Sequence, residues 1–332
     1  MKIAIVKLSA LGDIVHAMIA LQFLKAQHPD LIIDWLVEQR FAELLRHNPH
    51  ITNILTVNLK ALKTNKLAIS KQVQQVLSYA KANYDVVIDA QGLLKSAITA
   101  RLLGNTVVGF DKHSIRESMA SLFYNQKIAC AYHENTIIRN LEVLTKAFNI
   151  KVTHEQILNK QPFLFFHGED KKLYDFLSAT KRNIVFVIGS TWESRNYPMD
   201  KFVEVANVLQ QNCLVVWGSE AERIKAESIA SQSHYIQVMP PLDLNSLKAL
   251  IAHADLLIGN DTGPTHLAWG LNKASITLFG CTPISRVYQT DINCVLKSSS
   301  VVNPYKLNKL DYSISEIKPK HIIDLAEKLL ML

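Results

Sequence analysis

The amino-acid sequence predicts an α/β protein with two Rossmann-like, doubly wound parallel sheets that face one another across a cleft. Short apolar runs alternate with amphipathic helical stretches along the chain, an order typical of parallel sheets covered by helices. The alternation restarts after a polar, less regular segment at about residues 150–182. The length of 332 residues suits two domains of roughly 150 residues each, which we place at 1–165 and 166–332.

The apolar runs that we expect to form strands are short and bounded by polar residues. They are residues 2–6, 31–37, 86–89, 107–110, 184–188, 214–217, 255–258 and 275–279. Helical spacing of apolar residues predicts the helices, with Asp243 as the N-cap of one of them. These are residues 14–26, 71–82, 95–103, 244–251, 266–270 and 320–330.

Composition places the chain among ordinary globular proteins, with 48% hydrophobic and 20% charged residues. The longest nearly apolar stretch, residues 14–24, is too short for a bilayer, which needs about 20 residues. The N-terminus shows no signal-peptide cleavage site. The four cysteines form no CxxC pair, so we expect reduced thiols in a cytoplasmic protein and no metal site.

The positive charge is unevenly distributed. The net charge is +7, and residues 1–150 hold 17 Lys and Arg against 11 Asp and Glu, whereas the remainder holds 19 against 18. A basic face suits an anionic partner such as a phosphate, a nucleic acid or an anionic membrane surface. A solubilising surface explains the surplus equally well.

Ligands of such sheets bind where the strands end, and the loop after the first strand carries Gly12 and Asp13. Gly12 permits close backbone approach or a positive φ. The GxGxxG fingerprint of dinucleotide-binding proteins is absent. Asp13 is either the N-cap of the following helix or a general base that accepts a proton from an attacking hydroxyl.

The loop at residues 259–266 is the most informative stretch. Asp261, Thr262 and Gly263 put short side chains and backbone amides at a helix N-terminus, where phosphate binds through N–H donors and the helix dipole. His266 follows one turn later and is expected to point toward the same place. The alternative is an ordinary strand-to-helix turn capped by an aspartate.

Two further loops of the second half carry polar residues. Ser190 and Thr191 could donate hydrogen bonds to phosphate, and Arg195 could neutralise it with a planar, bidentate group. Glu222 follows another strand and could hold ribose hydroxyls. It could equally be a solvated residue at the start of a helix.

These loops together resemble the heptosyltransferase family, glycosyltransferase family 9, whose members have the two-Rossmann-domain GT-B architecture. The resemblance covers nearly the whole chain. Its motifs are KLSALGDIVHA at residue 7, IDAQGLLKSA at 88, RESMASLFYN at 116, WGSEAE at 217 and GNDTGPTHLA at 259. The second motif and the end of the third are similar to the type I branch of the family, which adds the first heptose.

The resemblance implies a reaction: transfer of L-glycero-D-manno-heptose from ADP-heptose to the Kdo of Kdo-lipid A, with inversion and without a covalent intermediate. We expect no metal or cofactor, because Arg195 and the Thr262–Gly263 backbone can take the place of a metal ion at the diphosphate. The resemblance assigns the catalytic base to Asp13. Arg195 stands where similar enzymes usually carry a lysine, and it is expected to stabilise the leaving diphosphate with a planar fork instead of a point charge. The donor residues that the resemblance implies are Ser190, Thr191, Glu222, Asp261, Thr262, Gly263 and His266.

The first half is expected to bind the acceptor, and the second half the donor. Gly12, Lys95 and Arg116 lie inside family-like motifs and are the acceptor residues that we expect. The basic first half suits the carboxylates and phosphates of the acceptor at an anionic inner leaflet. We therefore expect a cytoplasmic protein attached peripherally to the inner membrane, with no nucleic-acid partner. Further basic candidates are Lys60, Lys63, Lys66, Lys71 and Arg139.

Three other interpretations remain. The chain could be a type II heptosyltransferase or another nucleotide-sugar transferase of the lipopolysaccharide core. It could be a non-catalytic nucleotide-sugar binding protein, although binding alone would not require a base at Asp13. An NAD-dependent oxidoreductase is disfavoured by the missing glycine fingerprint.

Overall fold

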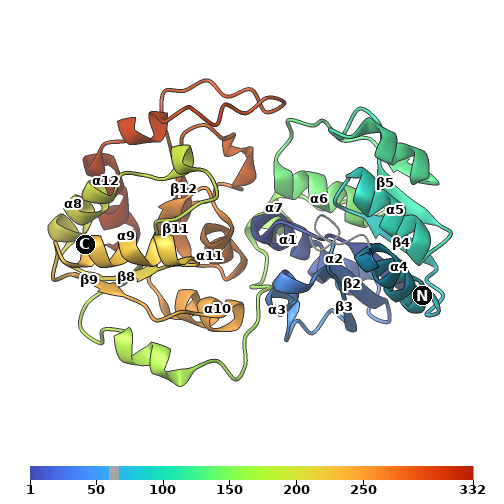
Figure 1. Ribbon diagram of the computed structural model, residues 1–332, viewed down its shortest axis with the longest axis horizontal. Coiled ribbons are helices and arrows are strands. Elements are labelled where there is room, and N and C mark those ends of the chain that lie inside the picture. Colours follow the sequence, from blue (N-terminus) through green and yellow to red (C-terminus); the bar gives the residue numbers. More distant parts are fainter. Residues whose placement is uncertain (60–66, 332) are drawn as a thin grey trace. The chain divides into compact units, whose positions relative to one another are not determined.

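The computed structural model describes residues 1–59 and 67–331. The chain divides into two compact units, Met1–Phe165 and Phe166–Leu332. Each unit is built on its own six-stranded parallel sheet with helices packed against it (Figure 1). The predicted α/β class with two doubly wound parallel sheets is confirmed.

The first sheet has the strand order β3-β2-β1-β4-β5-β6. Its central strand is fully buried at Ile3, Ala4 and Ile5, because helices cover both faces of a parallel sheet. The strands are β1 (Lys2–Val6), β2 (Ile32–Glu38), β3 (Asn53–Val57), β4 (Val86–Asp89), β5 (Val107–Phe110) and β6 (Gln126–Ile128). The helices are α1 (Leu11–Met18), α2 (Ala20–Gln27), α3 (Ala42–Leu45), α4 (Leu67–Ala80), α5 (Leu94–Leu103), α6 (Thr136–Thr145) and α7 (His154–Leu158). Short 3₁₀ turns are η1 (Gln39–Phe41), η3 (Ser118–Phe123) and η4 (Lys146–Phe148).

The second sheet has the order β12-β11-β10-β7-β8-β9. Its core includes the rings of Phe186, Phe202 and Tyr197, which pack as one tilted and one edge-to-face pair. The strands are β7 (Asn183–Val187), β8 (Asn212–Val216), β9 (Ile236–Val238), β10 (Leu256–Asn260), β11 (Ala274–Phe279) and β12 (Asn293–Lys297). The helices are α8 (Met199–Leu209), α9 (Glu220–Ala230), α10 (Leu244–His253), α11 (Leu267–Gly270) and α12 (Pro319–Leu330). The 3₁₀ turns are η5 (Lys171–Phe176), η6 (Glu193–Arg195), η7 (Gly263–His266), η8 (Ile284–Arg286) and η9 (Ser313–Glu316).

The eight predicted strands are all present, with ends within two residues of the expected ones. Asp243 caps α10 as predicted, because its carboxylate accepts a hydrogen bond from the Ser246 amide at 2.6 Å. The single helix expected over 14–26 is wrong. The helix begins at Leu11 and is interrupted at Ile19, which gives α1 and α2. The sequence also missed β3, β6, β9 and β12.

Within the described residues, no helix is both long and apolar enough to cross a bilayer. All four cysteines are free thiols. Burial raises the pKa of the Cys213 thiol to about 12, so this group stays protonated at neutral pH.

Candidate active site

The loop after β1 leads into α1, whose first turn carries the expected base. Asp13 is half-buried in the first turn of α1, and its Oδ2 accepts a hydrogen bond from the Ala10 amide at 3.1 Å. Ala10 is the N-cap, so the interpretation of Asp13 as N-cap is wrong. Gly12 lies within the helix, and a positive φ, one of the two alternatives for this glycine, is not found there.

The loop after β4 holds the loop after β1. The Gln91 side-chain oxygen accepts hydrogen bonds from the amides of Leu8 and Ser9, each at 3.1 Å. Gly92 adopts a φ of +70°, and a Cβ there would lie 2.7 Å from Ile115, so this turn requires glycine. The QG pair of the IDAQG motif therefore fixes the backbone that leads to Asp13.

Asp89, at the end of β4, is a buried carboxyl that organises the same loop. It accepts hydrogen bonds from the amides of Gln91 and Gly92 and from the hydroxyls of Ser96 and Tyr124. Burial raises the pKa of the Asp89 carboxyl, although these hydrogen bonds oppose the shift. Its role is to hold this loop. Asp89 was not singled out from the sequence, although a carboxylate at the end of an apolar strand could have indicated it.

The two expected basic acceptor residues lie near one glutamate. Lys95 is exposed in the first turn of α5, and the neighbouring Leu94 amide donates to Glu117 Oε2 at 2.7 Å. Arg116 is 67% exposed and lies 3.9 Å from Glu117 Oε1. Arg139 instead donates to the carbonyls of Cys130, Ala131 and Ser114, so it is a structural residue.

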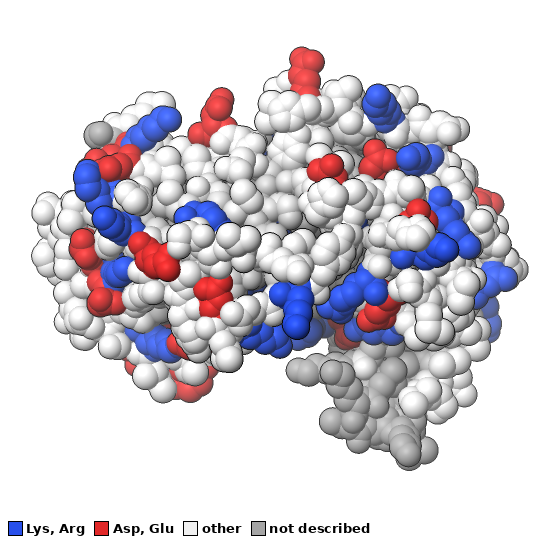
Figure 2. Space-filling model, turned by 90° about the horizontal axis from the view of Figure 1, so that it is seen from above, with Lys and Arg blue, Asp and Glu red and all other residues white. Residues whose placement is uncertain are grey.

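Basic side chains are spread over the face that Figure 2 draws. Lys60, Lys63 and Lys66 lie outside the described residues. On the face drawn in Figure 2, acidic side chains lie among the basic ones. The positive surplus is therefore not one continuous patch on that face.

The carboxyl edge of the second sheet holds a buried ionic cluster. Asp261 follows β10 and is 1% exposed. Its Oδ2 accepts a hydrogen bond from Arg195 Nη2 at 2.9 Å, and its Oδ1 lies 3.2 Å from His266 Nε2. Arg286, from η8, approaches Oδ2 with its Nε at 3.9 Å. The structure thus brings together three residues that the sequence singled out and one that it missed.

The cluster keeps Asp261 ionised. Burial by itself would raise the pKa of the Asp261 carboxyl, but Arg286, His266 and Arg195 more than offset burial and hold that pKa well below its usual range. A buried carboxylate with cationic partners orients them. Asp261 is therefore placed to aim guanidinium groups.

Asn260 joins the loops around this cluster. Its side-chain nitrogen, Nδ2, donates to the Ile188 carbonyl at 2.7 Å, and its side-chain oxygen, Oδ1, accepts from the Tyr197 backbone amide at 3.0 Å. Its own carbonyl accepts from the Thr265 hydroxyl at 2.7 Å. Asn260 is fully buried, so these bonds fix the loop after β7 against β10.

Glu222 lies beside the loop after β7. Its Oε2 accepts from the Gly218 amide at 2.7 Å, and its side chain crosses Gly189 so closely that a Cβ there would lie 2.2 Å from the carboxyl carbon. Ser190 donates its hydroxyl to the Trp192 carbonyl at 2.8 Å, and Thr191 is exposed. Ser190 would have to rotate its hydroxyl before it could donate to a ligand.

The Thr262–Gly263 turn differs from the expected helix N-terminus. It opens a four-residue 3₁₀ turn, η7, followed by the short helix α11. The macrodipole of so short a segment is small. Any anion binding here would rest on the backbone amides and the neighbouring guanidinium groups.

The family model for glycosyltransferase family 9 (heptosyltransferase) matches residues 73–306, more than half of the chain. The chain belongs to this heptosyltransferase family. Lipopolysaccharide heptosyltransferase 1 of Campylobacter coli is 35% identical to it over an alignment of 346 positions, which covers 99% of each chain. The protein of the same name from Pseudomonas aeruginosa is 30% identical, over 85% of this chain and 79% of that protein.

Solved structures share the fold of this heptosyltransferase. The structure of Escherichia coli heptosyltransferase WaaC with ADP-2-deoxy-2-fluoro heptose has a TM-score of 0.80 at 24% identity, and 99% of each chain is covered. The structure of the same protein with ADP has a TM-score of 0.76 at 25% identity, and 100% of each chain is covered. Both support the GT-B fold.

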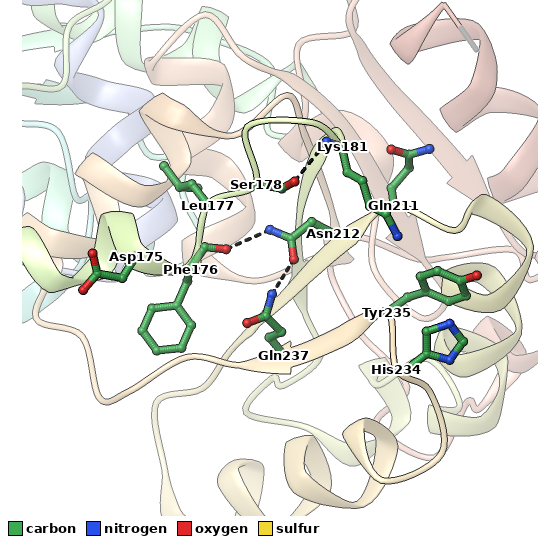
Figure 3. A pocket seen from close by; sticks show the side chains of 10 residues that line it. All are labelled: Asp175, Phe176, Leu177, Ser178, Lys181, Gln211, Asn212, His234, Tyr235 and Gln237. Carbon is green, nitrogen blue, oxygen red and sulfur yellow. Dashed lines mark hydrogen bonds between the residues drawn. The ribbon is translucent and has the colours of Figure 1, made fainter.

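A cavity of about 270 Å³ lies at the opposite edge of the second sheet of this heptosyltransferase, near the amino ends of β8 and β9 (Figure 3). The residues that line it include Lys181, Asn212, His234 and Tyr235. The Asn212 side chain is already bonded to the Phe176 carbonyl, Asn183 and Gln237. This cavity is separate from the Asp261 cluster. Elsewhere in the described residues, no three His, Cys, Asp or Glu side chains gather as a metal site.

Proposed function

We propose that this heptosyltransferase moves L-glycero-D-manno-heptose from ADP-heptose to the Kdo of Kdo-lipid A in lipopolysaccharide inner-core synthesis. The observation that carries the proposal is the cluster of Arg195, Asp261 and His266 at the carboxyl edge of the second sheet. The 35% identity to a lipopolysaccharide heptosyltransferase 1 supports it. The E. coli relative whose structures contain ADP or a fluorinated ADP-heptose supports the choice of donor.

The second unit binds the donor in this proposal. Negative charge develops on the diphosphate as the bond between the sugar C1 and the phosphate oxygen breaks. Arg195, held by Asp261, and the backbone amides of Thr262 and Gly263 stabilise this charge, and they are already in place before the reaction. Ser190, Thr191 and the Glu222 carboxylate complete the donor site, with Glu222 at the ribose. The reaction then needs no metal ion.

The first unit binds the acceptor, and Asp13 is the general base. A Kdo hydroxyl attacks C1 from the face opposite the diphosphate, so the anomeric centre inverts. The proton of that hydroxyl passes to the Asp13 carboxylate as the new O–C1 bond forms. C1 carries oxocarbenium character in this step. The hydrogen bond from the Ala10 amide to Oδ2 orients the carboxylate.

Acceptor binding takes place at a membrane surface. Lys95, Arg116 and the first turn of α1 at Gly12 face the anionic acceptor, and the positive surplus of residues 1–150 supports this assignment. Met119 and Leu122 in η3, the short turn that follows Arg116 in the sequence, are 63% and 74% exposed. Two apolar side chains beside cations suit the surface of an anionic bilayer. We assign the protein to the cytoplasmic face of the inner membrane.

The proposal is tested by mass spectrometry of a mixture of purified protein, ADP-heptose and Kdo-lipid A without added metal. A product heavier by one heptose is expected. Transfer only to an acceptor that already carries a heptose would indicate a type II enzyme. Binding of ADP-heptose with no transfer to either acceptor would favour a non-catalytic binding protein.

Replacement of the base tests the mechanism. Asp13→Asn should lower kcat by about 10²- to 10⁴-fold, the usual contribution of a general base, because the amide cannot accept the proton. Calorimetry should show an unchanged ADP-heptose affinity. The matched control is Asp30→Asn, an exposed aspartate before β2, which should keep full activity. Turnover at the wild-type rate in Asp13→Asn would remove Asp13 from the mechanism.

A further inference from the structure

Three neighbouring strands of the second sheet end beside one buried carboxylate. β11, β10 and β7 are adjacent and parallel, so the loops that follow them meet at one edge. The loop after β7 supplies Arg195, the loop after β10 supplies Asp261, and η8 after β11 supplies Arg286. Arg195 Nη2 and Arg286 Nε lie 2.9 Å and 3.9 Å from the same atom, Asp261 Oδ2.

The exposed fraction of the side chains increases from Asp261 through Arg195 to Arg286. The side chain of Asp261 is 1% exposed, that of Arg195 is 11% exposed and that of Arg286 is 35% exposed. Counted over these three side chains, two positive charges face one negative charge. The outer guanidinium, on Arg286, is the one with the largest solvent-facing part.

The loops that carry the two arginines are also tied together. Ser194 Oγ, beside Arg195, lies 3.7 Å from Cys281 Sγ in the loop that leads to Arg286, and both residues are buried. Asn260 fixes the loop after β7 to β10. The two loops that carry the guanidinium groups are therefore held together by contacts within the fold.

We propose that Arg286 is a second anion-binding residue of the donor site and contacts the distal phosphate of the ADP moiety. The inference deepens the proposed function and rests on it. Arg195 and Arg286 would together hold the phosphate that leaves with ADP, because a guanidinium pairs two N–H groups with two phosphate oxygens. Asp261 is then a positioning residue that aims both arginines and does not itself contact the phosphate.

Calorimetry with ADP and with AMP tests this role, because AMP lacks the distal phosphate. Arg286→Gln should weaken ADP binding by about 10- to 100-fold, the usual effect of losing a charge-assisted hydrogen bond. AMP affinity should change less than about threefold, which also shows that the variant is folded. Arg286→Lys keeps the charge and loses the fork, so it should fall between wild type and Arg286→Gln.

The matched control is Arg182→Gln, which removes a half-exposed arginine before β7 that pairs with Asp255 at 3.4 Å. It should leave the affinities for ADP and AMP unchanged. Unchanged ADP affinity in Arg286→Gln, or an equal loss of ADP and AMP affinity, would overturn the role of Arg286 alone. Failure of the wild-type protein to bind ADP would instead overturn the proposed donor, and this inference with it.

Discussion

Two buried aspartates carry opposite pKa shifts because their neighbours differ. Asp89 is held by hydroxyl and amide groups, and burial raises its pKa. Asp261 is equally buried but lies among Arg286, His266 and Arg195, which lower its pKa despite burial. The ionised Asp261 stabilises the fold above the usual carboxyl pKa, and this contribution is lost as pH falls through its lowered pKa. For Asp89 the sign is reversed, and stability falls as pH rises through its raised pKa.

The contact between Gly189 and Glu222 gives a prediction at the same scale. A methyl group at residue 189 would overlap the Glu222 carboxyl group, which is the mobile end of a long side chain. Gly189→Ala should therefore displace Glu222 and leave the fold intact. We expect ADP affinity to fall by about as much as in Glu222→Ala, with a change in Tm of less than about 2 °C. Calorimetry and thermal unfolding measure both effects.

A double-mutant cycle decides whether the two residues act through one contact. The double variant of Gly189→Ala and Glu222→Ala should bind ADP no more weakly than either single variant. Additive losses would show that residue 189 acts on ADP independently of Glu222. The matched control is Gly168→Ala in the same unit. No atom lies within 4 Å of the position that a Cβ at residue 168 would take. Because Gly168 has a positive φ, we expect Gly168→Ala to lower the stability of the fold and to leave ADP affinity unchanged.

At the scale of elements, the sequence located the interior of each sheet and missed its edges. The four missed strands, β3, β6, β9 and β12, are the four edge strands. Edge strands are covered less completely, and their residues are only partly buried, whereas β1 and β7 are almost wholly apolar and buried. A search for apolar runs finds interior strands, because only those need apolar residues on both faces.

The same reason limits what the sequence says about the candidate site. Asp13, Asp261 and His266 could be singled out from the sequence because each lies in a short motif that follows an interior strand. Other contacts join segments that follow different strands. Arg286 approaches Asp261, and Glu222 crosses Gly189. Sequence spacing does not encode such contacts, so they require the three-dimensional arrangement. The assignment of Asp13 as base remains a prediction.

Asn260 provides a prediction about how elements are joined. Asn260→Ala removes the side-chain amide that donates to the Ile188 carbonyl and accepts from the Tyr197 backbone amide. Asn260 is fully buried, so each of these two backbone groups loses a hydrogen-bond partner inside the protein. Each unsatisfied group costs about 1–3 kcal/mol, so urea unfolding should show that the free energy of unfolding falls by about 2–6 kcal/mol. The control Asn303→Ala removes one exposed local hydrogen bond and should cost less than about 1 kcal/mol. Equal costs would show that Asn260 does not tie these elements together.

At the scale of the whole molecule, the apolar side chains of η3 make a prediction about membrane attachment. Replacement of Met119 and Leu122 by serine should lower binding to phosphatidylcholine vesicles that contain phosphatidylglycerol by about tenfold or more, because each buried apolar side chain contributes about 1.5–3 kcal/mol. Co-sedimentation measures the bound fraction. Binding should also weaken as salt is added.

The control for this experiment replaces Val208 and Ile224 by serine. These side chains are 54% and 57% exposed on α8 and α9, and their loss should not change vesicle binding. If both pairs reduce binding equally, the attachment is not specific to η3. If neither does, η3 is not the surface that contacts the bilayer.

The strand order of the first sheet also constrains how the chain can fold. β1 pairs with β2, which is the next strand in the chain, and with β4, which begins only at Val86. Lys7 donates to the Ala90 carbonyl across 83 residues. Such non-local pairings slow folding because a long loop must close first. During synthesis, one edge of β1 therefore has no strand to pair with until β4 has left the ribosome. In this interval the apolar strand is accessible to chaperones and prone to aggregation.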